Sequence, residues 1–264
     1  MIRTENVEVV YDNGTRALAP TSLSFSAGDF VVLLGPSGAG KSTLLRTLND
    51  LVHPTAGRVI VDGLGELRSS AVVRAHRRRT GMVFQQHQLI GRSSVLANVL
   101  TGRLGNHSSL RTLLPVPPRD KMLALQALER VGLLDYALRR ADQLSGGQQQ
   151  RVGIARALVQ EPTFILADEP VASLDPATAD RVLALLHGIC KADGISAVVS
   201  LHQLDFAKRY ADRIVALAQG RVVFDGAPSK LGKADIELIY GATFLSTQRP
   251  AEDALGSLKT GTYA

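Results

Sequence analysis

The stretch FVVLLGPSGAGKSTLLRTL at residues 30–48 constrains the fold more than any other part of the sequence. Its first residues form a continuous apolar run, which is typical of a strand buried on both faces. Its last residues carry leucines at helical spacing. The glycine-rich segment between them, GPSGAGKST at 35–43, matches the pattern G-x-x-x-x-G-K-[ST]. We therefore expect a strand, a glycine loop and a helix in succession, an arrangement typical of α/β sheets.

The glycine loop has the composition of a phosphate-binding site. Glycines let successive backbone N–H groups turn toward one anion, and the following helix directs its partial positive end at the same place. In this pattern the Lys41 ammonium reaches the β- and γ-phosphates, and the Ser42 hydroxyl binds Mg²⁺. The predicted nucleotide-binding residues of the loop are Gly35, Pro36, Ser37, Gly38, Ala39, Gly40, Lys41, Ser42 and Thr43.

Two adjacent carboxylates follow another apolar run, in FILADEP at 164–170. Asp168 ends the expected strand, where α/β sheets place their ligand-binding groups. We expect Asp168 to hold Mg²⁺ and Glu169 to orient or deprotonate an attacking water. Glu169 taken alone is equally readable as a solvated loop acid, but the glycine loop and Asp168 favour the catalytic role. The predicted chemistry is phosphoryl transfer to water.

The rest of the chain alternates strands and helices, which predicts a mostly parallel α/β sheet. Short strands, broken at 13–14 and 28–29, precede the glycine loop. A largely helical insertion is expected at about 87–160. We predict a single domain over 1–245, followed by a polar tail over 246–264.

The composition is that of a globular protein with a basic bias. The net charge of +6 and the pI of about 9.7 suit an anionic partner: nucleic acid, an acidic membrane surface or a phosphate ligand. The densest basic run, RAHRRRTG at 74–81, has no interleaved aromatic residue, so a solvated helix end is favoured over a nucleic-acid patch. No apolar run approaches the roughly 18–20 residues that cross a bilayer. The lone Cys190 is expected to be a buried small hydrophobe.

A second glycine-containing helix start, LSGGQQQR, lies at 144–151. Ser145 is a good N-cap with free N–H groups behind it, although capped helices without a ligand are common. The complete motif LSGGQQQR is rarer than a capped helix start. Together with six other short motifs in the same order, it makes the sequence resemble the ATP-binding subunits of ABC transporters over nearly the whole chain. The residues and words that carry this resemblance are Tyr11, GPSGAGKST, VFQ, LSGGQQQR, FILADEP, SLDP and SLH.

The resemblance implies a role for each of these words. Tyr11 would stack on adenine, Gln85 would contact Mg²⁺ and the attacking water, and His202 would contact the γ-phosphate. Ser173 and Asp175 would belong to a loop that communicates between two ATP sites. Each residue alone also has an ordinary structural reading, as a core tyrosine, a surface amide or a structural histidine. The implied catalytic residues are Glu169, His202 and Gln85, and the implied metal ligands are Ser42, Gln85 and Asp168. The implied cofactors are ATP and Mg²⁺.

The resemblance also implies a fold and an assembly. The fold is that of a P-loop NTPase of the ABC ATPase type, with a mixed sheet core, an N-terminal antiparallel β subdomain and a helical subdomain insertion. In such ATPases the signature of one chain closes over ATP held by the P-loop of a second chain, head to tail. A homodimer is therefore implied, because each site needs backbone donors and a helix dipole from both chains. The signature residues are Ser145, Gly146, Gly147 and Gln148.

Segments outside these words are similar to phosphonate import ATPases, namely 81–105, 128–160, 200–226 and IYG at 239–241. This finer resemblance implies an importer at the cytoplasmic face of the bacterial inner membrane. There the homodimer would power two membrane permease subunits, which receive the substrate from a periplasmic substrate-binding protein. We expect the permease to dock on 87–115, where apolar VLANVL and LRTLL lie among polar loops.

Three other functions compete with phosphonate import. Phosphite or phosphate-ester importers have closely similar ATPases, and an importer for another small polar substrate is a further alternative. A non-transport ABC ATPase acting on DNA or ribosomes would suit the basic charge. DNA-repair members, however, carry a long coiled coil between the two glycine motifs, whereas Ser145 follows Lys41 by only 104 positions without sustained heptads. Ribosome-associated members generally fuse two cassettes. No nucleic-acid partner is therefore predicted.

Overall fold

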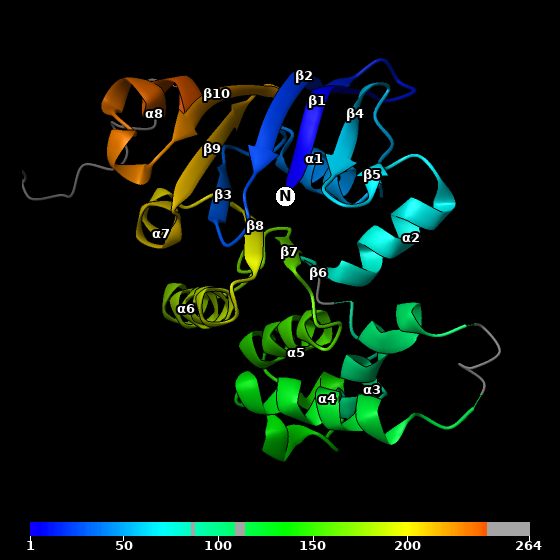
Figure 1. The fold of residues 1–264 in the computed structure, drawn as a ribbon. Helices are drawn as coiled ribbons and strands as arrows, with labels where there is room; N and C mark the ends of the chain where they lie inside the picture. The colour runs from blue at the N-terminus through cyan, green and yellow to red at the C-terminus, as the bar shows by residue number, and fades with distance from the viewer. Residues whose placement is uncertain (86–87, 109–113, 242–264) are drawn as a thin grey trace, which may run out of the picture.

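The computed structural model describes residues 1–85, 88–108 and 114–241, and Figure 1 shows them as two sheets with helices around them. The larger sheet has the strand order β10-β9-β3-β8-β7-β6, and the smaller has the order β2-β1-β4-β5. In the larger sheet all neighbours pair in parallel except β9 and β10, which form an antiparallel hairpin. The smaller sheet is antiparallel throughout. The predicted mixed sheet and antiparallel N-terminal strands are confirmed.

The elements follow the expected alternation. The strands are β1 (Ile2–Val10), β2 (Arg16–Phe25), β3 (Phe30–Leu34), β4 (Ala56–Val61), β5 (Gly65–Glu66), β6 (Thr80–Val83), β7 (Phe164–Ala167), β8 (Ser196–Leu201), β9 (Arg213–Ala218) and β10 (Arg221–Gly226). The α-helices are α1 (Lys41–Leu48), α2 (Ser70–Arg79), α3 (Val95–Leu100), α4 (Pro118–Arg130), α5 (Gly146–Leu158), α6 (Pro176–Asp193), α7 (Leu204–Tyr210) and α8 (Lys233–Tyr240). Short 3₁₀ helices include η1 (Thr101–Asn106).

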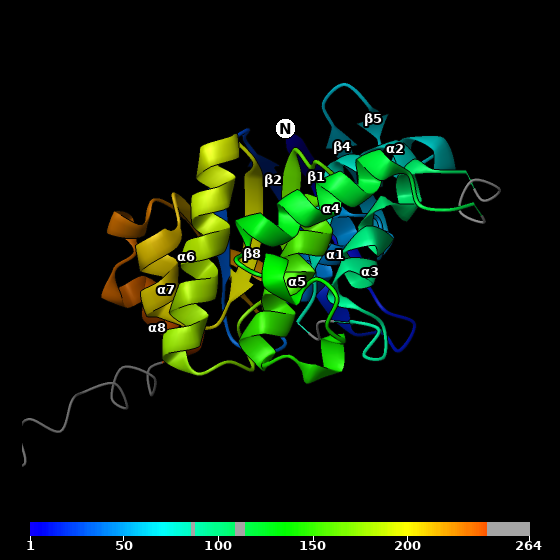
Figure 2. The same ribbon diagram turned by 90° about the horizontal axis from the view of Figure 1, so that it is seen from below.

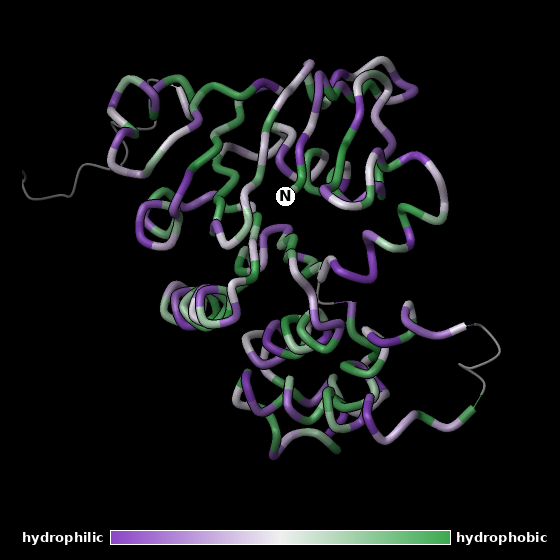
Figure 3. Tube along the Cα trace, viewed as in Figure 1, coloured by the Kyte–Doolittle hydropathy of each residue, from purple (hydrophilic) through white to green (hydrophobic). Residues whose placement is uncertain are grey.

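The strand β3 shows how the sheet joins two cores. All five of its residues are buried, and they alternate between two hydrophobic clusters. Phe30, Val32 and Leu34 face the cluster built with the helices α3 to α8, whereas Val31 and Leu33 face the cluster built with α1 and the N-terminal strands. The central strands are accordingly hydrophobic along their length in Figure 3. This two-sided burial explains the uninterrupted apolar run in the sequence.

The segment between β6 and β7 contains α3, η1, α4 and α5, which form the lower layer in Figure 1. α3 packs on both α4 and α5, and α5 packs on α6, which lies beside it in Figure 2. The predicted insertion at about 87–160 covers these helices, although residues 87 and 109–113 lie outside the described part of the chain. The predicted tail, 246–264, also lies outside it.

The arginines of the basic run, Arg74, Arg77, Arg78 and Arg79, are exposed, as predicted for a solvated helix end. The run forms the second half of α2, where the Arg77 guanidinium donates to the carbonyls of Asn49 and Asp50, and Arg78 Nε donates to Gly105 O at 2.7 Å. These side chains therefore tie α2 to the end of α1 and to η1. None of the helices in the described ranges is long and apolar enough to cross a membrane.

Cys190 lies in the core, as predicted. It is buried among the helices that cover the larger sheet, and burial is the main reason that the pKa of its thiol is raised to about 12. The thiol therefore stays protonated at neutral pH and behaves as a small hydrophobe.

Candidate functional site

The glycine loop between β3 and α1 adopts a backbone that only glycine fits at two positions. Gly35 has φ of 150° and Gly40 has φ of 100°. A Cβ atom on Gly35 would come within 2.2 Å of the carbonyl oxygen of Leu217, and one on Gly40 within 2.5 Å of the carbonyl oxygen of Ala17. The loop is thus held closely against β9 and β2, which fixes the direction of its N–H groups.

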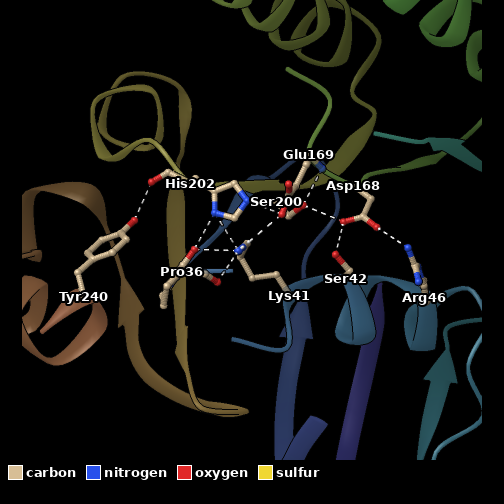
Figure 4. Close-up of polar contacts among 10 residues, drawn as sticks. Pro36, Lys41, Ser42, Arg46, Asp168, Glu169, Ser200, His202 and Tyr240 are labelled. Carbon is tan, nitrogen blue, oxygen red and sulfur yellow. Dashed lines mark hydrogen bonds and ion pairs between the residues drawn. The ribbon is translucent and has the colours of Figure 1, made fainter. Parts of the chain in front are cut away.

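Lys41, the first residue of α1, directs its ammonium back across the loop (Figure 4). Nζ donates to the carbonyls of Gly35 at 2.8 Å and Pro36 at 2.9 Å, and it lies 3.8 Å from Glu169 Oε1. The side chain is only 3% exposed. Burial lowers the pKa of Lys41, while the carboxylates of Glu169 and Asp168 oppose that shift. The two carbonyls and Glu169 thus hold the Lys41 ammonium in one position beside the loop, where it can neutralise a phosphate.

Asp168 lies at the end of β7, as predicted, and joins three elements. Its Oδ1 accepts from Ser42 Oγ at 2.7 Å and from Ser200 Oγ at 3.1 Å, and its Oδ2 lies 3.4 Å from Arg46 Nη2. A carboxylate beside a hydroxyl at the start of the P-loop helix fits Mg²⁺, which takes one or two protein oxygens and completes its shell with phosphates and water. Ser42 and Asp168 are thus the pair that can hold the metal.

Glu169 and His202 face each other beside Lys41 (Figure 4). Glu169 Oε1 lies 2.5 Å from His202 Nε2, and His202 Nδ1 lies 3.2 Å from Gly35 O and 3.3 Å from Lys41 Nζ. Nε2 can donate to the Glu169 carboxylate, while Nδ1 either accepts from Lys41 or donates to the Gly35 carbonyl, depending on the tautomer. Glu169 has φ of 47°, which non-glycine residues seldom adopt, and its N–H donates to Ser200 Oγ at 2.8 Å.

Two other predicted residues lie at the edges of this group. Tyr11 follows β1 and is 42% exposed, and its Oη lies 3.1 Å from Thr43 Oγ1 in the P-loop helix. The exposed ring is therefore held beside the loop. Gln85 is exposed and lies two residues beyond Val83, whose carbonyl accepts from the Asp168 N–H at 2.9 Å. The chain that carries Gln85 therefore passes next to the carboxylate pair.

The second glycine motif, LSGGQQQR, forms the start of α5 and closes it with a capping box. Ser145 Oγ accepts from the Gln148 N–H at 3.4 Å, and the Gln148 side chain accepts from the Ser145 N–H at 2.9 Å. Ser145 and Gly146 are exposed, whereas Gly147 is buried with its Cα against Thr178: a Cβ there would lie 2.5 Å from Thr178 Cγ2. α5 and α1 cover opposite faces of the larger sheet, so this helix start and the P-loop face separate surroundings within one copy.

Ser173 and Asp175 lie in the exposed turn that leads from the carboxylate pair to α6. Asp175 caps α6, because its Oδ1 accepts from the Thr178 N–H at 3.0 Å. The hydrogen bonds from Thr178 lower the pKa of Asp175, which keeps it ionised at the positive end of the helix. The turn at 173–175 is thus fixed at its C-terminal end by α6, the helix that also supports Gly147.

Three residues in contact with the site were not predicted from the sequence: Arg46, Ser200 and Tyr240. Arg46 and Ser200 bind Asp168, and Tyr240 Oη donates to the carbonyl of His202 at 2.9 Å. Ser200 and Tyr240 were present in the words SLH and IYG. Their polar side chains inside apolar segments were the available signal, because a buried hydroxyl needs a partner.

The chain matches the ABC transporter family over residues 18–172. It is 61% identical over 251 residues to the phosphite import ATP-binding protein PxtA of Stutzerimonas stutzeri, which covers 95% of this chain and 90% of that relative. It is 56% identical over 241 residues to the phosphonates import ATP-binding protein PhnC 3 of a Nostoc species, with coverage of 91% and 92%.

Solved structures agree with these relatives. The dimeric post-hydrolysis state of the ATP-binding cassette MJ0796, bound to ADP and Pi, superposes with a TM-score of 0.75 at 34% identity, covering 86% of this chain and 99% of that one. A nucleotide-free ATP-binding cassette from an ABC transporter gives a TM-score of 0.76 at 28% identity, covering 97% and 99%. With the glycine loop and the carboxylate pair in place, these matches show that the chain belongs to the ABC transporter family and has its ATPase fold.

Proposed function

We propose that this chain is the ATP-hydrolysing subunit of an importer for phosphonate or a related phosphorus oxyanion such as phosphite, and that it works as a head-to-tail homodimer. The observation that carries the ATPase part is the group formed by Lys41, Asp168, Glu169 and His202 at the P-loop. The observation that carries the substrate class is the likeness to relatives named for phosphite and phosphonate import.

The geometry supports hydrolysis as follows. Lys41 and the loop N–H groups bind the phosphates of ATP, and Tyr11 stacks on the adenine. Glu169 takes a proton from the attacking water as the water oxygen bonds to the γ-phosphorus, and the bond from the γ-phosphorus to its bridging oxygen breaks, which releases phosphate and ADP. His202 keeps the Glu169 carboxylate aimed at that water and itself contacts the γ-phosphate. Ser42, Asp168 and Gln85 would hold Mg²⁺, which would supply positive charge to the phosphates.

The position of the second glycine motif supports a dimer. Ser145 and Gly146 are exposed at the start of α5, on the far side of the sheet from the P-loop of the same copy, and the first N–H groups of a helix have no carbonyl partner within it. In a head-to-tail pair the α5 start of each copy meets the γ-phosphate at the P-loop of the other. The cassette MJ0796, bound to ADP and Pi, is itself described as dimeric. Two ATP sites, each built from both copies, are the result.

The proposed permease partners dock near α2 and η1. A cavity of about 570 Å³ lies between these elements and is lined by Arg68, Arg74, Arg77, Arg78 and His53 against the single carboxylate of Asp50. Its lining includes Gly102, Gly105 and Asn106, within the segment 87–115 in which docking is predicted from the sequence. We propose that two permease subunits bind at this face of the dimer, at the cytoplasmic side of the bacterial inner membrane, and that a periplasmic protein delivers the substrate.

The ATPase part is tested with Glu169→Gln, matched by Glu237→Gln on the exposed face of α8. Glu169→Gln keeps the shape but cannot accept the proton, so kcat falls at least about a hundredfold, while ATP still binds and holds the dimer closed. Steady-state hydrolysis and size-exclusion chromatography with ATP measure the two effects. Normal turnover by Glu169→Gln would remove this residue from the role of base.

The transport part is tested in a bacterial host that lacks phosphonate and phosphite uptake. The chain is expressed with its co-encoded permease and binding protein, and growth is measured on methylphosphonate, phosphite or phosphate as the phosphorus source. Growth that needs an intact Lys41 on methylphosphonate or phosphite supports the proposal. Uptake of an unrelated small polar solute instead, with ATPase activity intact, would reassign the substrate to another importer class.

A further inference from the structure

The last described helix reaches back to the ATPase site through one tyrosine. Tyr240 ends α8, 38 residues after His202, and its Oη donates to the His202 carbonyl oxygen at 2.9 Å. Figure 4 shows the ring on α8 and the hydroxyl pointing to the backbone at the end of β8. Tyr240 is part of the IYG word at 239–241, to which no step of the proposed mechanism assigns a role.

The tyrosine is held firmly enough to act as a support. α8 packs on β9 and β10, and its residues Ile236 and Ile239 are buried in the core that covers the larger sheet. The helix start is closed by Asp235, whose carboxylate accepts from the Gly232 N–H at 2.8 Å. Burial raises the pKa of Tyr240, so its hydroxyl remains protonated and available as a donor.

The carbonyl that Tyr240 binds lies at a critical point of the chain. β8 ends at Leu201 and α7 begins at Leu204, so His202 is in the short connection between them. On one side its imidazole meets Glu169, Lys41 and the Gly35 carbonyl, and on the other its backbone carbonyl meets Tyr240. A rotation of this peptide would move the imidazole, because the ring position depends on the backbone that carries it.

We propose that Tyr240 is a positioning residue for ATP hydrolysis, which fixes the His202 peptide so that its imidazole stays aligned with Glu169 and the γ-phosphate. This inference rests on the proposed role of His202. It implies that the alignment of the histidine depends on the docking of α8, an element outside the P-loop core.

The test compares Tyr240→Phe with Tyr210→Phe. Tyr210 in α7 is also partly buried, and its hydroxyl donates to the Asp180 carboxylate at 2.8 Å on α6 rather than to the site. In Tyr240→Phe we expect kcat for ATP hydrolysis to fall about fivefold, the rate equivalent of one neutral hydrogen bond. KM for ATP should stay within about twofold, because the ring and the P-loop contacts are kept. Tyr210→Phe should leave both values unchanged.

A second readout follows the histidine itself. The chain has six histidines, and the ¹⁵N side-chain resonances of His202 can be assigned by comparison with His202→Gln. Tyr240→Phe should shift them and Tyr210→Phe should not, while thermal unfolding of the two variants is alike. If Tyr240→Phe turns over as the wild type does and leaves these resonances in place, Tyr240 has no positioning role. Normal hydrolysis by His202→Gln would instead overturn the role of His202 in the proposed function.

Discussion

Removing the Ser200 hydroxyl tests a group that holds Asp168 and Glu169 in place, while both carboxylates are left unchanged. Ser200 is fully buried at the end of β8, where Oγ accepts from the Glu169 N–H at 2.8 Å and donates to Asp168 Oδ1 at 3.1 Å. Ser200→Ala deletes one atom and leaves both neighbours without that partner. Because Glu169 has φ of 47°, a conformation that costs of order 1–3 kcal/mol, the lost bond also removes part of what holds it there.

The expected magnitude follows from these two bonds. An unsatisfied buried group costs about 1–3 kcal/mol, so Ser200→Ala should lower the free energy of unfolding by about 2 kcal/mol. If about 1.4 kcal/mol of the effect falls on the transition state, kcat decreases about tenfold. We also expect the apparent affinity for Mg²⁺ to weaken, since Asp168 loses one of the bonds that orient it.

Ser196→Ala is the matched control for this prediction. Ser196 lies on the same strand and is also buried, and its Oγ accepts from the Gly28 N–H at 2.9 Å, away from the carboxylates. Urea unfolding should show both variants destabilised, whereas steady-state hydrolysis with titrated Mg²⁺ should show a lower kcat for Ser200→Ala alone. Equal kcat values in the two variants would refute the idea that Ser200 supports catalysis.

Three further outcomes are expected. Lys41→Ala should raise the Kd for a fluorescent ATP analogue at least about tenfold, because a charge-assisted bond to phosphate is lost; unchanged affinity would contradict the P-loop assignment. Chains altered singly at Lys41 and at Ser145 should each be inactive, yet mixed dimers regain one intact site of two; no recovery in ATPase assays after mixing would count against shared sites. The pKa of Asp120 is lowered although burial opposes it, because His107 and Arg103 donate to it. Its contribution to stability is therefore present above the pH at which a free aspartate titrates and is lost as the pH falls toward its folded pKa, which urea unfolding of wild type and Asp120→Asn between about pH 6 and 3 measures.

The sequence predicted those features whose cause is local. The apolar run at 30–34, the glycine loop and Asp168 at a strand end could all be read directly, because burial on two faces and a phosphate loop each leave a contiguous pattern. The structure brings Lys41, Ser42, Asp168, Glu169 and His202 together as expected for neighbouring parallel strands.

The contacts that escaped prediction depend on which elements are neighbours in space. Arg46 reaches Asp168 across 122 positions of sequence, which requires β3 and β7 to flank β8. Tyr240 reaches His202 only because α8 folds back onto β9 and β10. The basic run of α2 is the exposed helix end that was predicted, but nothing local shows that Arg77 and Arg78 would also donate to backbone carbonyls at 49–50 and 105. Strand order and helix docking decide these contacts, and neither leaves a pattern in a single segment.

The close fit of Gly147 on Thr178 has a consequence for communication between two copies. Because the backbone of α5 at Gly147 packs directly on the Thr178 side chain of α6, and the Thr178 N–H donates to Asp175, the start of α5 and the turn at 173–175 share one support. In the proposed dimer that turn leaves the carboxylate pair of one ATP site, while the α5 start completes the other. In that arrangement, a displacement of Glu169 as phosphate departs would act through the turn and Thr178 on the start of α5. In the proposed dimer, loss of phosphate at one site would then weaken the binding of ATP at the other site.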